Sequence, residues 1–170
     1  MNKVIYATFL TLLSACATQG PGPSASAQLS PTKGNTAAGT VTFTQTGAKV
    51  LVVAEVRELK PNAEHGFHIH EKGDCSSGDG MSTGVHFNPT TQPHGAHGTG
   101  SHHSGDLHSL VADTNGVAKL KFESSTISID TGVTNIIGRG LIVHRDPDDY
   151  KTQPTGNAGP RLACAVITKI

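Results

Sequence analysis

The chain has 170 residues, 35% of them hydrophobic, and its 13 basic side chains balance 13 acidic ones. This length suffices for one domain with a hydrophobic core, and zero formal net charge gives no argument for nucleic acid as a partner. The 20 glycines and the short bursts of β-branched residues favour many short strands and long loops over helices.

The first residues have the features of an export signal. Lys3 precedes a short apolar stretch, residues 4–13, which is too short to span a membrane as a helix. It ends in Leu-Ser-Ala-Cys, which resembles a bacterial lipoprotein signal, where cleavage precedes the cysteine and lipid is attached to its sulfur. We therefore expect a signal peptide over residues 1–15 and lipid on Cys16. The alternative is an ordinary signal peptide with a chance cysteine.

The next segment, residues 16–37, is rich in proline, glycine, serine and alanine after its cysteine. This composition is typical of a flexible tether, so we expect the folded domain to cover residues 38–170. The expected location is the periplasm or cell envelope. Contact with a membrane is expected through the N-terminal lipid only.

The folded part opens with a predicted β-hairpin. Residues 40–46 alternate polar and apolar side chains with a period of two, which indicates a half-buried strand. Gly47 and Ala48 offer a turn, and residues 49–57 follow as the partner strand. A strand over residues 64–71 comes next.

A long loop and several short strands make up the rest. Residues 72–105 show no sustained periodicity, and a loop of this length usually has a function or a covalent staple. The strand-like segments after it are 107–112, 117–122, 125–129, 141–144 and 163–169. A polar loop, residues 145–160, separates the last two. The pattern predicts an all-β fold, an eight-stranded antiparallel Greek-key barrel or sandwich with two long functional loops.

Histidines cluster in and around these loops. His68 and His70 lie two positions apart on a predicted strand, so both rings point to the same side. His144 ends a distant apolar strand and can be aimed rigidly at the same place. All-imidazole coordination of this kind suits copper or zinc.

A second set of ligand residues lies in the long loop. It comprises His86, His94, His103 and Asp106. Three imidazoles and one carboxylate are typical ligands of tetrahedral zinc. Because the loop alone lacks regular structure, a metal bound there would also order it.

The cysteines predict a disulfide. With Cys16 assigned to lipid, Cys75 and Cys164 remain, and an exported protein occupies a compartment that permits disulfides. We therefore predict a bridge between Cys75 and Cys164. The alternative is two free thiols.

Five ordered motifs resemble those of the copper/zinc superoxide dismutases, from about residue 38 to the end of the chain. They are Gly66–Glu71, Gly84–Pro89, His103–Leu107, Ile137–His144 and Gly156–Cys164. A lone His-x-His pair would be weak evidence, whereas five motifs in order with compatible spacing are specific. The sandwich architecture of this family agrees with the strand count above.

The resemblance implies one copper and one zinc ion per subunit. The implied copper ligands are His68, His70, His86 and His144. The implied zinc ligands are His86, His94, His103 and Asp106. His86 stands in both sets because its two ring nitrogens would bridge the metals.

Further residues take roles by the same resemblance. Arg161 would lie beside copper and attract an anionic substrate. Asp148 would link a copper histidine to a zinc histidine. His65 would hydrogen-bond backbone near the copper strand, and Lys151 would either add positive potential near the channel or be a plain solvated charge.

Three histidines match no ligand of the family. They are His97, His102 and His108. We expect them to be exposed, with a weak surface metal site as the alternative reading.

The implied activity is the dismutation of superoxide to dioxygen and hydrogen peroxide by a copper redox cycle. His86 and Arg161 would act in catalysis, and the enzyme would protect the cell envelope from extracytoplasmic superoxide. The alternative is a non-catalytic exported copper- or zinc-binding lipoprotein that buffers metal. Such relatives usually lack part of the copper set or the arginine. The sequence leaves open whether the protein is a monomer or a homodimer.

Overall fold

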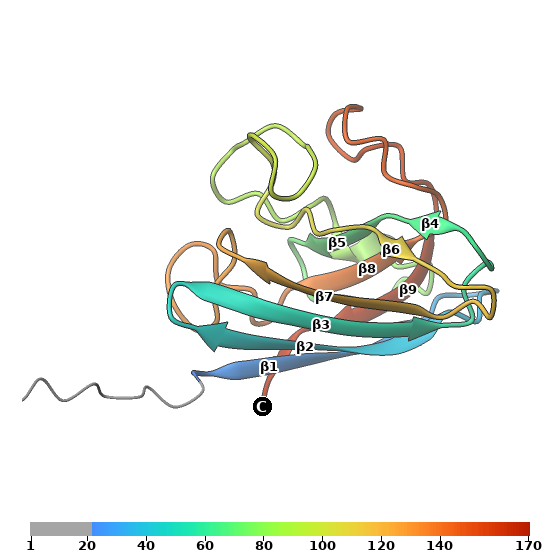
Figure 1. Ribbon diagram of the computed structural model, residues 1–170, viewed down its shortest axis with the longest axis horizontal. Helices are drawn as coiled ribbons and strands as arrows, with labels where there is room; N and C mark the ends of the chain where they lie inside the picture. The colour runs from blue at the N-terminus through green and yellow to red at the C-terminus, as the bar shows by residue number, and fades with distance from the viewer. Residues whose placement is uncertain (1–21) are drawn as a thin grey trace, which may run out of the picture.

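The computed structural model describes residues 22–170, and this part of the chain consists almost entirely of strands and loops (Figure 1). The elements are β1 (Ser24–Pro31), β2 (Ala38–Thr46), β3 (Lys49–Arg57), β4 (Glu64–His65), β5 (Phe67–His70), η1 (Met81–Thr83), β6 (Leu110–Val111), β7 (Ala118–Ser124), β8 (Gly140–His144), β9 (Arg161–Val166) and β10 (Thr168–Lys169). The short element η1 is a 3-10 helix. Within residues 22–170 no helix is long and apolar enough to cross a membrane.

Eight strands form one curled antiparallel sheet. Seven lie in the order β5-β8-β9-β1-β2-β3-β7, and β10 pairs with β1. Since β1 lies between β9 and β2, the last strands of the chain return beside the first strand of the described residues. The loop before β6 and the loop between β8 and β9 rise on the same side of the sheet (Figure 1). The predicted all-β fold with antiparallel strands and two long loops is therefore confirmed.

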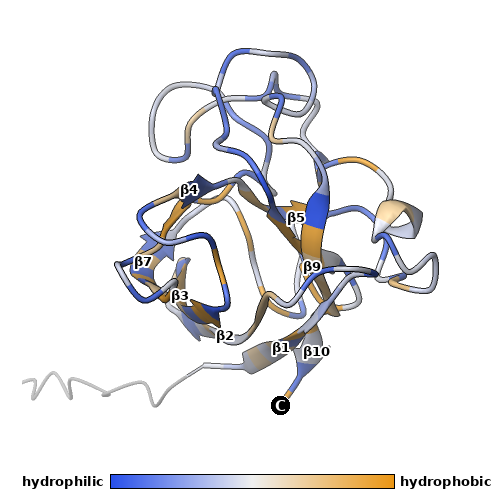
Figure 2. Ribbon diagram, turned by 90° about the vertical axis from the view of Figure 1, so that its right-hand side faces the viewer, coloured by the Kyte–Doolittle hydropathy of each residue, from blue (hydrophilic) through white to orange (hydrophobic). Residues whose placement is uncertain are grey.

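The core lies inside the curled sheet, and its apolar residues come largely from the strands, which carry much of the hydrophobic colour in Figure 2. On β2 the alternating pattern buries Val41 and Phe43, and on β3 it buries Val50 and Val52. The two strands pair along their whole length, from Ala38 opposite Arg57 to Thr46 opposite Lys49, which confirms the predicted hairpin. Period-two patterning thus places one face of each strand in the core.

Strands β5 and β8 are buried on both faces. Phe67 and Ile69 point into the hydrophobic core, so the alternate positions, His68 and His70, point to the other side. These two histidines are nevertheless fully buried, because the long loops cover them. The polar face of β5 is therefore an enclosed site on a rigid strand.

The predicted tether is wrong for residues 24–31. They form β1, a strand inside the sheet that pairs with β2, β9 and β10. Ala25, Ala27 and Leu29 alternate with polar residues and are at most 1% exposed. Small side chains gave this segment the composition of a linker, although its period-two pattern is that of a strand. The folded unit therefore begins before residue 38.

The predicted signal peptide, the predicted lipid on Cys16 and the first part of the predicted tether lie outside the described residues.

Several predicted strands at the C-terminal side have different bounds. Residues 125–129 contribute only an isolated bridge between Ser128 and Asn135, and the segment serves to place Ile127 and Ile129 in the core. The predicted strand 107–112 is reduced to β6, and the strand predicted over 163–169 divides into β9 and β10 around the buried Ile167. In each case buried apolar side chains produced a strand-like pattern that the hydrogen bonding does not follow.

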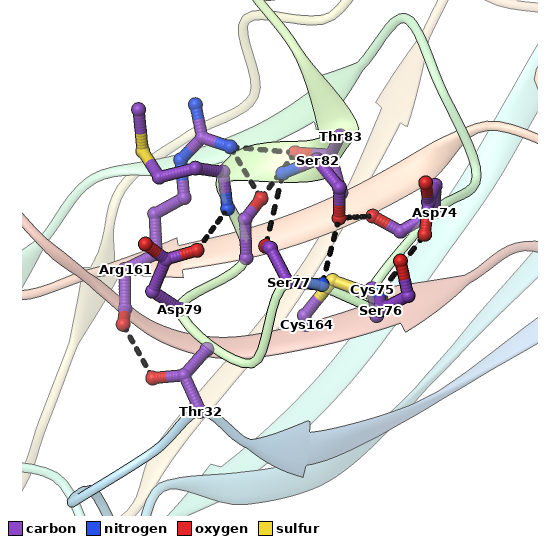
Figure 3. Close-up of a disulfide and its surroundings, with 12 residues drawn as sticks. Thr32, Asp74, Cys75, Ser76, Ser77, Asp79, Ser82, Thr83, Arg161 and Cys164 are labelled. Carbon is purple, nitrogen blue, oxygen red and sulfur yellow. Dashed lines mark hydrogen bonds between the residues drawn. A yellow bond between two sulfur atoms is a disulfide. The ribbon is translucent and has the colours of Figure 1, made fainter.

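The predicted disulfide between Cys75 and Cys164 is confirmed (Figure 3). It joins two residues 89 positions apart. Cys164 lies on β9, and Cys75 begins the turn-rich segment that leads to η1. The bridge thus ties the first half of the long loop to the central sheet.

Candidate metal centre

A first group of buried histidines lies where β5 and β8 meet. His68 and His70 point the same way from β5, and β8 pairs with β5 and ends at His144. His86 lies in the long loop, and its main chain forms an isolated antiparallel β-bridge with that of His70. One nitrogen from each of these four rings lies within 4.8 Å of the other three.

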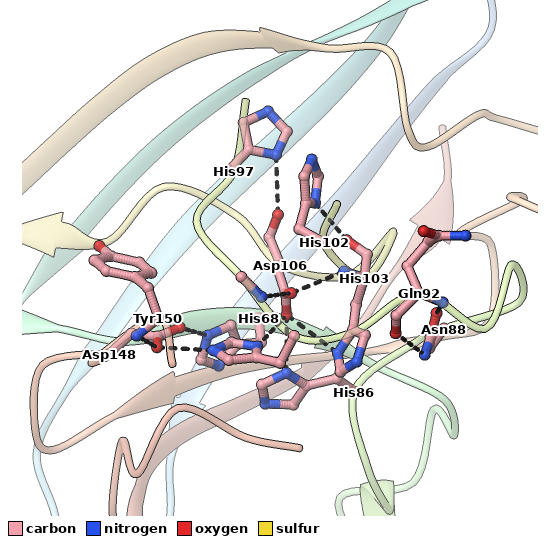
Figure 4. Close-up of polar contacts among 12 residues, drawn as sticks. His68, His86, Asn88, Gln92, His97, His102, His103, Asp106, Asp148 and Tyr150 are labelled. Atoms are coloured by element: carbon pink, nitrogen blue, oxygen red, sulfur yellow. Dashed lines mark hydrogen bonds and ion pairs between the residues drawn. The ribbon is translucent and has the colours of Figure 1, made fainter. Parts of the chain in front are cut away.

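A second group gathers in the loop and shares His86 with the first (Figure 4). The Oδ1 atom of Asp106 lies 2.9 Å from His86 Nδ1, 3.1 Å from His94 Nδ1 and 3.4 Å from His103 Nδ1. In a tetrahedral zinc site with bonds of about 2.0 to 2.1 Å, ligand atoms lie roughly 3.3 Å apart. The four ligand atoms therefore fit around one small cation.

Backbone hydrogen bonds fix this loop on β5. The Ile69 N–H donates to Gly105 O at 2.9 Å, and Phe87 N–H donates to Ile69 O at 2.8 Å. Gly105 N–H donates to Phe87 O, also at 2.8 Å. A Cβ on Gly105 would lie 2.3 Å from Ile69 O, so only glycine permits this approach. His86 and Asp106, each one residue from these contacts, are thereby brought against the strand that carries His68 and His70.

The two groups present buried ring nitrogens without a hydrogen-bond partner. These atoms are His68 Nδ1, His70 Nε2, His86 Nε2, His94 Nδ1, His103 Nδ1 and His144 Nε2. In several of these rings the opposite nitrogen must be the N–H, because it donates to an oxygen. His70 Nδ1 donates to Gly84 O at 2.9 Å, and His144 Nδ1 donates to Gly159 O at 3.1 Å.

A neutral imidazole carries one N–H, so the remaining nitrogen is a bare lone pair. Buried polar atoms in folded proteins have partners, and lone pairs that converge without a donor call for a cation between them. Imidazole nitrogens suit copper and zinc, and the carboxylate in the second group suits zinc. The residues therefore fit two metal ions that share one ring.

Asp148 connects the two groups from outside. Its Oδ2 accepts a hydrogen bond from His68 Nε2 at 2.7 Å, and its Oδ1 accepts one from His94 Nε2 at 2.9 Å. Tyr150, in the left-handed conformation at φ 58, donates its backbone N–H to the same Oδ1 at 2.7 Å. A Cβ on Gly156 would lie 1.9 Å from Asp148 Oδ1, which reserves that position for glycine. Asp148 thus orients one ring in each group.

The electrostatics of the metal-free groups favour a cation. Burial favours the protonated form of Asp106, but the nearby side chains of His103, His86 and His94 outweigh it and hold the pKa of Asp106 well below its usual range. Burial lowers the pKa of His94, yet the neighbouring carboxylates of Asp106 and Asp148 raise that pKa to about 9 overall, so a metal ion that binds this ring displaces a proton from it. Burial, with His68 nearby, lowers the pKa of His86 to about 3. His86 is therefore neutral and available as a ligand.

Arg161 lies at the start of β9 (Figure 3), opposite His144 of the first group in the pairing of β8 with β9. Its Nη1 donates to Thr83 Oγ1 at 2.7 Å and also to Gly80 O, and its Nη2 donates to Gly84 O at 2.7 Å. Gly84 O also accepts the hydrogen bond from His70 Nδ1. Burial lowers the pKa of Arg161, but a guanidinium keeps its charge in proteins. Because Gly84 O accepts hydrogen bonds from both Arg161 and His70, the positive charge of the guanidinium is held next to the first group of histidines.

Two of the remaining histidines are buried, which corrects the expectation that they are exposed. His97 and His102 are each 8% exposed, whereas His108 is exposed as predicted. The cause is that the loop folds back onto β7, where His97 packs against Phe122 with ring centroids 5.0 Å apart.

The ring nitrogens of His97 and His102 form hydrogen bonds with main-chain groups of the loop. His97 Nδ1 donates to Asp106 O at 2.9 Å, and His102 Nδ1 donates to His103 O at 2.7 Å. His102 Nε2 accepts from Gly98 N–H at 3.4 Å. Within residues 22–170 the three extra histidines do not form a metal-binding group, so the alternative of a surface metal site finds no support.

His65 donates from Nδ1 to His144 O at 2.9 Å, as expected of a residue that supports the backbone near β5. Lys151 is exposed, and its contribution to steering stays a prediction. No sequence pattern indicated Gln153, whose side chain holds the main chain of His94. No local pattern could have found it, because this contact joins residues 59 positions apart.

Comparison with known proteins agrees with the geometry. A sequence model of the family described as copper/zinc superoxide dismutase matches residues 37–167. A superoxide dismutase [Cu-Zn] of Paramecium bursaria Chlorella virus 1 is 44% identical over 135 residues, covering 76% of this chain and 71% of the relative. The enzyme of the same name from Saccharomyces cerevisiae is 42% identical over 137 residues, covering 76% of this chain and 88% of the relative.

A solved structure extends the likeness to the fold. The crystal structure of the clock protein EA4 superposes with a TM-score of 0.79 at 39% sequence identity. The match covers 98% of this chain and 100% of that one.

Proposed function

The chain belongs to the copper/zinc superoxide dismutase family, and from this premise we propose the roles of its individual residues and its place in the cell. Its reaction is the dismutation of superoxide, and copper and zinc are its cofactors. One observation carries the assignment of residues. Bare, buried imidazole nitrogens converge with the Asp106 carboxylate in two groups that share His86.

Each group would hold one metal. Copper would be bound by His68, His70, His86 and His144. Zinc would be bound by His86, His94, His103 and Asp106. What supports this division is that the first group contains imidazole only, whereas the second adds a carboxylate with the spacing of a tetrahedral site.

Bound copper would supply the one-electron redox chemistry of the reaction, whereas zinc, which has no redox chemistry, would be held by His86 together with the other ligands of the second group. The protein supplies geometry, a proton site and charge. The Nδ1 atom of His86 faces Asp106 of the second group, which leaves Nε2 buried and without a hydrogen-bond partner. This bare nitrogen can take a proton and give it to the product. Asp148 fixes the orientation of His68 through Oδ2 and that of His94 through Oδ1.

Arg161 would bind the superoxide anion beside the first group. A fixed charge in a confined site concentrates small anions, and its guanidinium is held there by three acceptors. We expect Arg161→Ala to lower kcat/KM severalfold or more, on the order of 10-fold, while copper and zinc content stay at the wild-type level. Stopped-flow measurement of superoxide decay checks this. Arg145→Ala is the matched control, since Arg145 is exposed and pairs with the adjacent Asp146. An unchanged rate in Arg161→Ala would reject the role.

A single measurement tests the proposed function against its alternative, a metal-buffering lipoprotein without catalysis. We expect purified protein to contain one copper and one zinc per chain and to remove superoxide in a cyanide-sensitive manner. Zinc alone, or both metals without activity, would favour the buffer. The presence of the complete first group together with Arg161 supports the enzyme.

We also propose that the protein acts outside the cytoplasm, anchored by lipid on Cys16, and that it protects the cell envelope from superoxide. The apolar N-terminal segment with its Leu-Ser-Ala-Cys ending and the disulfide between Cys75 and Cys164 support export. Mass spectrometry of the mature N-terminus tests this. A lipid-modified Cys16 is expected, and an intact residue 1 would contradict it.

A further inference from the structure

The main chain of each loop residue proposed as a zinc ligand, other than His86, is held by a side chain that is not itself a ligand. The first of these contacts is made by Gln153, in the loop between β8 and β9. Its Oε1 accepts the His94 N–H at 2.8 Å, and its Nε2 donates to His94 O at 2.9 Å. One side-chain amide thus satisfies both the N–H and the carbonyl of His94, which fixes the position of that main-chain unit relative to Gln153.

The other two contacts come from the buried histidines outside the metal groups. His97 Nδ1 donates to the carbonyl of Asp106, and His102 Nδ1 donates to the carbonyl of His103, at 2.9 Å and 2.7 Å (Figure 4). Because each nitrogen faces a carbonyl oxygen, it must carry the N–H, and each ring is therefore a defined tautomer.

These side chains are themselves anchored to the rest of the molecule. The His97 ring lies 4.9 Å from that of His102, 4.7 Å from that of His108 and 5.0 Å from that of Phe122 on β7, measured between centroids. Phe122 packs against the hydrophobic core. The loop that carries Gln153 is fastened separately, by Tyr150.

Tyr150 OH donates to Glu64 Oε1 at 3.0 Å and lies 2.7 Å from Ser109 Oγ. Glu64 belongs to β4, so this contact joins the loop between β8 and β9 to the two-stranded sheet that β4 forms with β6. The zinc-ligand segment, residues 94–106, is therefore held from two sides. Rings attach it to β7, and Gln153 attaches it to a second, independently fastened loop.

We propose that Gln153, His97 and His102 are positioning residues that preorganise residues 94–106 for zinc before the metal arrives. This rests on the proposed zinc site and adds how the site is kept in shape. A ligand set already in place binds without the cost of ordering its loop, so loss of a fixing contact appears as weaker binding. Outer partners of metal ligands contribute about 10- to 100-fold in affinity.

The test uses full-length zinc-loaded, copper-free protein and measures the rate of zinc transfer to a chelator in excess. Gln153→Ala and His97→Phe are expected to release zinc about 10-fold faster than wild type. His97→Phe keeps the ring packing and removes the donor. His97→Asn removes the ring and keeps a donor near the same place, so we expect it to retain zinc within about 2-fold of wild type, well below the 10-fold loss.

Two matched controls separate positioning from general loosening. His108→Ala removes a ring from the same cluster, and Gln92→Ala removes an amide whose side chain contacts only Thr90 O among the described residues. Both are expected to release zinc at the wild-type rate. Amide hydrogen exchange of the metal-free protein is expected to speed up over residues 94–106 in Gln153→Ala and His97→Phe.

The outcomes are distinct. Wild-type rates in both Gln153→Ala and His97→Phe would overturn the inference. Equal losses in His97→Phe and His97→Asn would also overturn it, since a hydrogen-bond donor at this position would then make no difference to zinc retention. Wild-type protein that binds no zinc would instead reject the zinc site itself and the inference with it.

Discussion

Replacing His86 by alanine is expected to lower superoxide dismutation by at least about 100-fold, beyond what loss of a partner outside the coordination sphere costs. The reason is that His86 alone belongs to both groups of ligand atoms. Its ring is 2% exposed and stacks on that of His68 with centroids 4.0 Å apart. The substitution removes one ligand from each metal and the proton site between them. Activity per chain, with copper and zinc measured by mass spectrometry, checks this.

The loss of metal and activity expected in His86→Ala should not occur in a histidine variant outside the two groups. His108→Ala is the matched control, because His108 is exposed and lies outside both groups. It is expected to retain both metals and full activity. His86→Ala should lose zinc as well as activity, since Asp106 Oδ1 would face only His94 and His103. Full activity with both metals in His86→Ala would refute the shared-ligand role.

The ligand residues could be predicted because their geometry is local or follows from strand periodicity. His68 and His70 share a face for the simple reason that a strand alternates its side chains. His103 and Asp106 lie three residues apart in one turn, where Asp106 Oδ2 accepts the His103 N–H at 2.9 Å. The disulfide followed from counting cysteines. In each case the prediction depends only on residue types and short sequence spacings, so it needs no knowledge of the fold.

The rest depended on contacts between distant residues. The strand β1 was hidden by its composition, because its small and polar residues are typical of a tether. Its place between β2 and β9 depends on residues far away in the sequence. His97 is buried because β7 supplies Phe122, 25 positions further along the chain. Gln153 in a polar loop has no pattern that marks it. Side chains that bind main chain elsewhere leave no periodic signal.

Removal of the disulfide by the double substitution Cys75→Ala and Cys164→Ala is expected to lower the free energy of unfolding by about 4 to 5 kcal/mol, less any compensation in the native state. The bridge joins residues 89 positions apart, and constraining a loop of that length removes much conformational freedom from the unfolded chain. Urea unfolding of the metal-free proteins checks this, because bound metal would add its own stabilisation. Wild-type protein under reducing conditions should approach the stability of the variant, and equal midpoints for oxidised wild type and variant would contradict the prediction.

The same variant should also lose activity, through Arg161. The guanidinium is held by the carbonyls of Gly80 and Gly84, both in the segment that Cys75 begins, while Cys164 lies three residues after Arg161 on β9. The disulfide therefore clamps the segment that offers the acceptors to the strand that offers the arginine. Without the disulfide, the segment that carries Gly84 loses one of its attachments to β9. The Gly84 carbonyl also accepts the hydrogen bond that orients His70, so that ring is affected as well. We expect kcat/KM to fall by about as much as in Arg161→Ala even where copper content is restored, and a fully metallated variant with wild-type kcat/KM would show that Arg161 keeps its place without the bridge.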